Sequence, residues 1–249
     1  MRFYSPSSLS AFEQCPRRYQ LAYVEHVETE EVSIACLRGS AAHFGIERIY
    51  RQLMKGRKPT LSDVLLATRE WWRKELKNVE AIGATDGDPA QYLAQAEQCI
   101  RHYYERFDPF DQDETVAIEK RIEAELDPNH GIVGYADRVV RRNGHFEIHD
   151  YKTGSRKGQH KDIFDNRQLA LYAMGVQAEY PDAAEIRLVW HYVQIDGVHE
   201  AVHSVEEYEA LRRATLRLIG EIESARSFPC KRSWLCRWCD YASICDGAD

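Results

Sequence analysis

Three cysteines near the C-terminus constrain this chain more than any other feature. They are Cys236, Cys239 and Cys245, in the segment Cys-Arg-Trp-Cys-Asp-Tyr-Ala-Ser-Ile-Cys, and their spacing is C-x2-C-x5-C. Thiolates so close in sequence are typical of a metal site, and a fourth is needed to close a tetrahedral zinc site or hold a cubane iron–sulfur cluster. Cys15 and Cys230 are the candidates. Cys15 would tie the two ends of the chain together, whereas Cys230 would make the tail a small local knuckle.

Composition limits the remaining classes of protein. A chain of 249 residues with 44% hydrophobic content can bury a full core, and one domain is expected. No uncharged apolar run approaches the ~18 residues of a membrane span, so we expect a soluble, cytoplasmic protein without membrane contact. Seven cysteines, an odd number, suit a reducing compartment and a metal site better than a disulfide framework. The net charge of −7 implies that nucleic-acid contacts come from local basic patches, such as residues 152–161.

The hydrophobic pattern changes from helical to strand-like and back along the chain. Apolar residues at helical spacing come first, period-two alternation follows, and Asn143-Gly144 is a hairpin turn. Ser204 and Glu207 form a capping box at the start of the last helix. The predicted elements are two short helices within 7–24, helices 39–54, 61–76 and 89–107, strands 116–126, 131–141 and 145–152, helix 166–180, strands 186–192 and 198–203, and helix 204–226. This order predicts an α/β fold with a mixed sheet.

Chemically reactive side chains gather on the second and third predicted strands. Alternation places Asp150 and Lys152 on one face of their strand, and the Asn143-Gly144 hairpin brings Asp137 within reach of Asp150. Two carboxylates together with a histidine from an early helix suit a hard divalent cation. Lys152 would add positive charge for a phosphate or an attacking water. Glu119 and Glu47 are expected to be solvated or to lie outside the ligand set.

Six motifs in order along nearly the whole chain resemble the PD-(D/E)XK nuclease superfamily, in its RecB-like branch with an iron–sulfur cluster. The motifs are the opening segment Ser-Pro-Ser-Ser-Leu-Ser-Ala-Phe-Glu-Gln-Cys15-Pro-Arg-Arg-Tyr19, Gly39-Ser-Ala-Ala-His43, Gly134-Tyr-Ala-Asp137-Arg, Asp150-Tyr-Lys152-Thr-Gly154, Gln168-Leu-Ala-Leu-Tyr172 and the tail cysteines. The resemblance implies a restriction-endonuclease-like core at about 114–203, with a mixed central sheet flanked by helices. A helical segment at about 40–110 precedes this core. The segment 204–249, completed by Cys15, would be an iron–sulfur-stapled subdomain joining the N- and C-termini of this single domain, 1–249.

The resemblance also implies roles for individual residues. His43, Asp137 and Asp150 would bind Mg²⁺ or Mn²⁺, with the backbone carbonyl of Tyr151 as a further ligand, and Lys152 would orient or activate the attacking water. Two residues four apart on one helix face, Gln168 and Tyr172, would position the lysine or the DNA strand. Cys15, Cys236, Cys239 and Cys245 would hold a structural [4Fe–4S] cluster.

These assignments predict a metal-dependent deoxyribonuclease, an exonuclease on single-stranded or frayed DNA ends. It would act in DNA repair, recombination or CRISPR adaptation, with a helicase or a CRISPR-adaptation protein as partner. The chain has no Walker-type phosphate loop, so a stand-alone nuclease or a subunit is expected. Two alternatives stay open. One is a DNA-binding subunit with little turnover of its own, and the other is a zinc-stapled protein of unrelated function.

Overall fold

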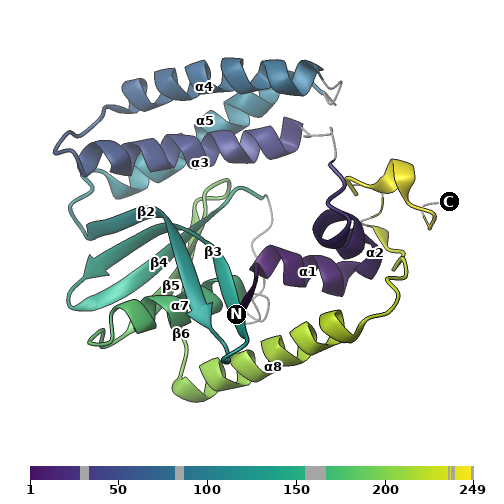
Figure 1. Cartoon of the computed structure of the whole chain (residues 1–249). Coiled ribbons are helices and arrows are strands. Elements are labelled where there is room, and N and C mark those ends of the chain that lie inside the picture. Colours follow the sequence, from purple (N-terminus) through teal and green to yellow (C-terminus); the bar gives the residue numbers. More distant parts are fainter. Residues whose placement is uncertain (29–33, 82–86, 155–166, 235, 237–238, 248–249) are drawn as a thin grey trace.

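A computed structural model describes residues 1–28, 34–81, 87–154, 167–234, 236 and 239–247. The basic stretch expected at 152–161 falls largely outside these ranges. A mixed sheet forms the centre of the fold, with helices packed on both of its faces (Figure 1). The predicted α/β class with a mixed sheet is confirmed. In the part of the chain that the structure describes, no helix has the length and apolar character needed to cross a membrane.

The sheet has six strands in the order β1-β3-β4-β5-β6, and β2 pairs with β3. The strands are β1 (Arg2–Tyr4), β2 (Glu114–Glu125), β3 (His130–Arg142), β4 (His145–Lys152), β5 (Ile186–Tyr192) and β6 (Gly197–Val202). β1 with β3 and β4 with β5 are parallel, and the other pairs are antiparallel. Asn143 and Gly144 both have positive φ, which is the conformation of a tight hairpin turn and explains why this dipeptide joins β3 to β4.

One edge of β3 is shared by two strands. β1 pairs with His130 to Ile132, and β4 pairs with Arg138 to Arg142. Between them, among the described residues, no strand pairs with this edge of β3 from residue 133 to residue 137. β3 therefore has a short open edge, and this edge carries Gly134 and Asp137 of the third motif.

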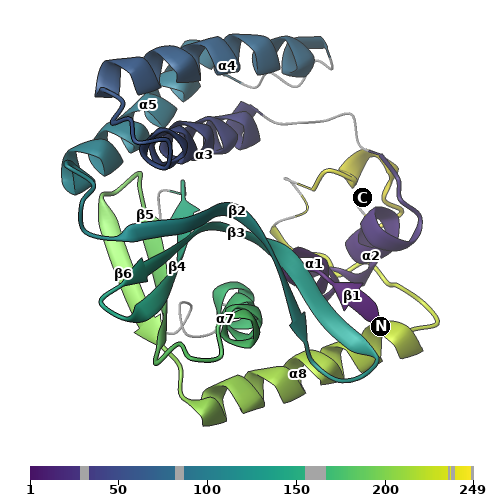
Figure 2. The same cartoon turned by 60° about the vertical axis from the view of Figure 1, so that its left-hand side comes forward.

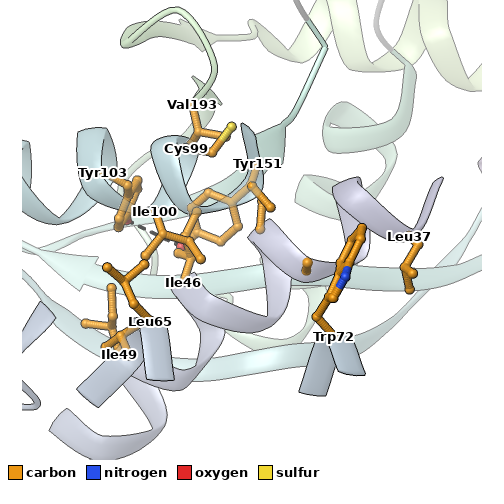
Figure 3. Packing of buried hydrophobic residues seen from close by; sticks show 14 of the residues in the cluster. Leu37, Ile46, Ile49, Leu65, Trp72, Cys99, Ile100, Tyr103, Tyr151 and Val193 are labelled. Carbon is orange, nitrogen blue, oxygen red and sulfur yellow. Dashed lines mark hydrogen bonds between the residues drawn. The ribbon is translucent and has the colours of Figure 1, made fainter. Parts of the chain in front are cut away.

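Helices α3 (Ile34–Leu53), α4 (Leu61–Ala81) and α5 (Pro89–Phe107) form the layer on one face of the sheet. Figure 3 shows how Ile46, Ile100 and Tyr103 of these helices pack together with Tyr151 of β4. α3 begins five residues before the predicted start at Gly39, because Ile34 and Leu37 continue its buried face into this core. The layer fixes the position of α3, which carries His43.

The opposite face is covered by α7 (Arg167–Glu179), and β2 and β3 curve over it (Figure 2). Helix α8 (Val205–Ser224) begins with the predicted capping box, in which Ser204 and Glu207 exchange hydrogen bonds between side chain and backbone. Leu218, Ile219 and Ile222 of α8 pack in a third cluster with residues of β1 and α1.

The N-terminal segment comprises α1 (Pro6–Gln14), α2 (Pro16–Tyr19) and a π-helical turn, η1 (Gln20–Val24). α1 begins before the predicted start at residue 7. Its N-cap is Ser5, because Pro6 suits the first helical position and Ser8 completes a capping box with Ser5. α2 lies beside the C-terminal tail with its 3₁₀ turn η3 (Ala242–Ile244), so segments from the two ends of the chain are neighbours (Figures 1 and 2).

A buried polar network joins β3, β4 and β5 on the side of α5. Arg138 forms a bidentate ion pair with Asp113, with distances of 2.9 and 3.1 Å. It also donates a hydrogen bond to His149 Nδ1 at 3.2 Å. His149 Nε2 lies 3.0 Å from Glu147, so this nitrogen donates and Nδ1 accepts from both Arg138 and His191 Nε2, the latter at 2.7 Å. Both imidazoles are therefore neutral. Burial holds the pKa of each well below its usual range, aided at His149 by Arg138 and at His191 by His149 and then Arg138.

Candidate active site and metal centre

Three ligand-type residues from different elements meet beside the open edge of β3. His43 Nδ1 on α3 lies 3.5 Å from Asp137 Oδ2 on β3, and Glu119 on β2 completes the group. One ligand atom from each of the three lies within 4.8 Å of the others, which is compatible with binding to one metal ion. In the described part of the chain it is the only group of three or more histidine, cysteine or acidic side chains with that spacing.

Glu119, expected from the sequence to be solvated or outside the ligand set, lies with His43 and Asp137. It is exposed, yet it belongs to the metal-compatible group. The register explains why: Ile118 pairs with Arg138 and Lys120 with Ala136, so Glu119 lies opposite Asp137. Glu119 has φ of 48°, a local irregularity of the kind that redirects side chains next to active sites. The turn at 127–131 sets the register of β2 and β3. The position of Glu119 opposite Asp137 could therefore have been inferred from the sequence.

Asp150 and Lys152 lie next to this group on β4. The hairpin places the Tyr151 backbone N–H 2.7 Å from Asp137 Oδ2, to which it donates. Lys152 Nζ lies 2.7 Å from Asp150 Oδ2, an ion pair without the alignment of a hydrogen bond. That oxygen is buried and has no hydrogen-bond partner among the described residues. A buried carboxylate oxygen with unused acceptor capacity fits coordination to a hard cation.

Electrostatics at Asp137 also fit a cation. Burial raises its pKa to about 7, and nearby Asp150 and Glu119 increase the shift, whereas His43 and the Tyr151 N–H oppose it. The charged carboxylate therefore lacks sufficient positive charge around it. A divalent cation bound by oxygen and imidazole ligands would supply that charge, so the donor set here fits Mg²⁺ or Mn²⁺.

The two helix residues predicted to assist catalysis contact each other and β3. Tyr172 is buried, and its hydroxyl interacts with the Gln168 side chain and accepts the Tyr135 backbone N–H on the open edge of β3. Through Tyr172, this pair is linked to the open edge of β3. Tyr151 contacts Asp137 through its backbone N–H, and metal ligation by its carbonyl stays a prediction.

The cysteines of the two chain ends line one cavity of about 100 Å³. Cys15, Cys230, Cys236, Cys239 and Cys245 all border it. The Cys245 and Cys230 sulfurs are 3.8 Å apart. Backbone N–H groups donate to two of the sulfurs, from Lys231 to Cys15 at 3.3 Å and from Ser233 to Cys236 at 3.4 Å.

The environments of Cys15 and Cys230 differ. Burial tends to raise the pKa of the Cys15 thiol, but N–H groups of Lys231, Arg18 and Arg17 outweigh it and hold this pKa below its usual range. Burial and the neighbouring thiols raise the pKa of Cys230 to about 11. A thiol with a lowered pKa is more readily the thiolate form, which is the form that metals bind.

Similarity to known proteins extends over nearly the whole chain. The chain is 26% identical over 275 residues to the Gene 69 protein of Mycobacterium phage D29, covering 97% of this chain and 95% of the phage protein. The crystal structure of SSO0001 matches with a TM-score of 0.45 and 17% identity, covering 97% of this chain and 85% of that one. The family model of the PD-(D/E)XK nuclease superfamily matches residues 4–246, and the chain therefore belongs to that superfamily.

Proposed function

We propose that this chain, as a metal-dependent nuclease of its superfamily, is a deoxyribonuclease that removes nucleotides from single-stranded DNA ends. The observation that carries the proposal is the convergence of His43, Glu119, Asp137 and Asp150 with Lys152 beside the open edge of β3. A pure DNA-binding subunit would have no need for buried acids beside a lysine.

The side chains divide the work of phosphodiester hydrolysis. His43, Asp137 and Asp150, together with Glu119, would hold Mg²⁺ or Mn²⁺, and such an ion supplies a Lewis acid that lowers the pKa of water and neutralises charge on the phosphate. The Lys152 ammonium, only partly exposed and fixed by Asp150, donates to the attacking water or to a phosphate oxygen. The Tyr151 N–H fixes Asp137 in orientation, so the site is preorganised.

The tail cavity supports a [4Fe–4S] cluster held by Cys15, Cys236, Cys239 and Cys245, as in the RecB-like branch. A single zinc ion bound at about 2.3 Å needs its four sulfurs within about 4 Å of each other. Among the described thiols, no three have sulfurs that all lie within 4.8 Å of one another. This spacing is wider than a single zinc ion needs and favours a polynuclear cluster. N–H groups that donate to sulfur are a feature of such sites. The cluster would be structural.

The biological setting follows from the resemblance and is proposed with it. Trimming of DNA ends serves repair, recombination or CRISPR adaptation, and a helicase or a CRISPR-adaptation protein would be the partner. A partner that opens the duplex fits an active site that uses single strands.

The test is hydrolysis of DNA by anaerobically purified protein. Single-stranded and duplex DNA labelled at either end is incubated with the unsubstituted chain, Lys152→Ala and a control, Lys74→Ala, on the exposed face of α4, in Mn²⁺, Mg²⁺ or EDTA. We expect metal-dependent shortening from one end that Lys74→Ala retains and Lys152→Ala loses by at least about a hundredfold. Intact DNA in every metal, with binding retained, would instead identify the chain as a DNA-binding subunit.

A further inference from the structure

A groove of about 710 Å³ lies beside the candidate active site. Gln168 and Tyr172 border it together with residues that have no role in the catalytic proposal. It is bordered by α1, the open edge of β3 and the start of α7. We call it the β3 groove and define it by Ser7 and Ser10 of α1, Tyr135 of β3 and Arg167 of α7. The groove exists because β1 and β4 pair with β3 on either side of residues 133–137 and leave this edge without a strand.

An aromatic ring projects from the open edge. Tyr135 is 55% exposed, which is unusual for a tyrosine in the middle of a long strand. Its backbone is held in place, because its N–H donates to the buried Tyr172 hydroxyl. An exposed aromatic ring on a firmly held backbone is a feature on which single-stranded nucleic acids stack a base, whatever the base.

The opposite side of the groove offers donors suited to phosphate. Arg167 binds Glu13 through Nη2 at 2.6 Å, while its Nη1 is buried and has no hydrogen-bond partner among the described residues. The guanidinium therefore keeps unused donors, and guanidinium groups match the geometry of phosphate oxygens. Ser7 and Ser10 are exposed and add hydroxyl groups along α1.

The position of the groove relates it to the reaction. Tyr135 and Asp137 are two residues apart on β3, or about 7 Å along the strand. A DNA strand whose phosphate reaches the Asp137 group must pass Tyr135 on one side. We propose that the β3 groove binds the nucleotide adjacent to the scissile phosphate in single-stranded DNA, with its base stacked on Tyr135 and its phosphate bound by Arg167 and the α1 serines.

This inference rests on the proposed nuclease function and names a feature of its substrate. A base inside a duplex is already stacked on both faces, so Tyr135 favours single strands over duplexes. Stacking does not read the identity of the base, so the groove imposes little sequence preference.

Binding without turnover provides the test. Lys152→Ala protein, used to prevent cleavage, is titrated with fluorescein-labelled oligothymidylate, and Tyr135→Ala, Tyr135→Phe, Arg167→Ala and Arg167→Lys are added singly to this background. Arg213→Ala, an exposed arginine on α8 outside the groove, is the control. We expect Tyr135→Ala to weaken binding about tenfold and Tyr135→Phe to retain it. Arg167→Ala should reduce the slope of log binding constant against log salt concentration by about one, which corresponds to one counterion released. Arg167→Lys should recover part of this slope.

A scan of abasic positions locates the stacked nucleotide. The affinities of the Lys152→Ala protein and of the Lys152→Ala/Tyr135→Ala protein are compared for each oligonucleotide. When the missing base is the one that stacks on Tyr135, the two affinities should be equal. When the abasic site lies elsewhere, the tenfold difference between them should remain. Binding of duplex DNA should not change with Tyr135→Ala.

The outcomes separate the groove from the catalytic proposal. If the unsubstituted chain degrades single-stranded DNA but Tyr135→Ala and Arg167→Ala bind like the control, the groove inference is wrong and the nuclease stands. If Tyr135→Ala weakens duplex and single-stranded binding alike, stacking is refuted. If no variant binds DNA and the unsubstituted chain does not cut it, both proposals fail. Melting temperatures of all variants confirm that the exposed substitutions leave the fold intact.

Discussion

Gly134→Ala tests whether the contact between β3 and α7 positions the active site. A Cβ on Gly134 would lie 2.6 Å from Cζ and Cε1 of Tyr172 and nearer still to its hydroxyl. Tyr172 is buried and its hydroxyl accepts the Tyr135 N–H, so it cannot move without losing that bond. Overpacking of this kind costs about 1–3 kcal/mol, and the lost hydrogen bond about 1 kcal/mol.

The expected loss is therefore about 2–4 kcal/mol in the free energy of unfolding, or roughly 5–15 °C in Tm for a chain of this size. Because Gly134 precedes Asp137 by three residues on β3, displacement of the strand should also lower kcat about 10- to 100-fold. The assay is thermal unfolding together with single-turnover cleavage of labelled DNA. Gly220→Ala is the control, since its added Cβ would meet no atom within 4 Å and alanine favours the helix interior.

A double-mutant cycle isolates the contact. Tyr172→Ala removes the ring that the new Cβ would meet, so Gly134→Ala should cost little further stability in that background. The role assigned to this contact is refuted if the losses of stability in the two single variants add up in the double variant. It is also refuted if Gly134→Ala has the same Tm as the Gly220→Ala control.

Three further substitutions test other parts of the structure. Glu119→Gln should raise the Mn²⁺ concentration needed for half-maximal cleavage about tenfold by metal titration, and an unchanged requirement would remove Glu119 from the ligand set. Cys245→Ala should abolish the brown colour and bound iron of anaerobically purified protein, whereas Cys230→Ala should keep both; iron lost equally from the two would contradict the ligand assignment. His149 and His191 are neutral in the fold but take up protons near pH 6.5 when unfolded, so stability should fall as pH drops below about 6.5, by up to about 1.4 kcal/mol per unit for each. Urea unfolding of His191→Asn should show about half that slope, and an unchanged slope would mean that His191 is not buried neutral.

Local patterns were sufficient for most of the fold. The strand β4 and helix α5 have the predicted boundaries, because a hairpin turn, a proline at a helix start and strict alternation are properties of neighbouring residues. The same hairpin placed Asp137 near Asp150, so the approach of the two acids followed from the sequence. His43 reached this pair through the packing of α3, which only the resemblance had implied.

Features that depend on distant pairing were missed. β1 is three residues long, too short to show a period, and its partner on β3 is more than a hundred residues away. The open edge of β3 exists only because β1 occupies one end, so the groove and the exposure of Tyr135 were equally hidden. The fifth cysteine at the tail cavity, Cys230, was recognised as a nearby thiol, but its distance from Cys245 depends on how the two ends of the chain meet.

Helix α1 connects the tail cavity to the β3 groove. Its first residues border the groove and Cys15, at its C-terminal end, borders the cavity, about 13 Å apart along the helix. The start of α1 is held by β1, and its end is held by the Lys231 N–H on the Cys15 sulfur. A rigid helix fixed at both ends transmits the position of one end to the other. The cluster proposed for the cavity would thus do more than join the chain ends, because by fixing Cys15 it would also fix the serines that line the path of the DNA strand.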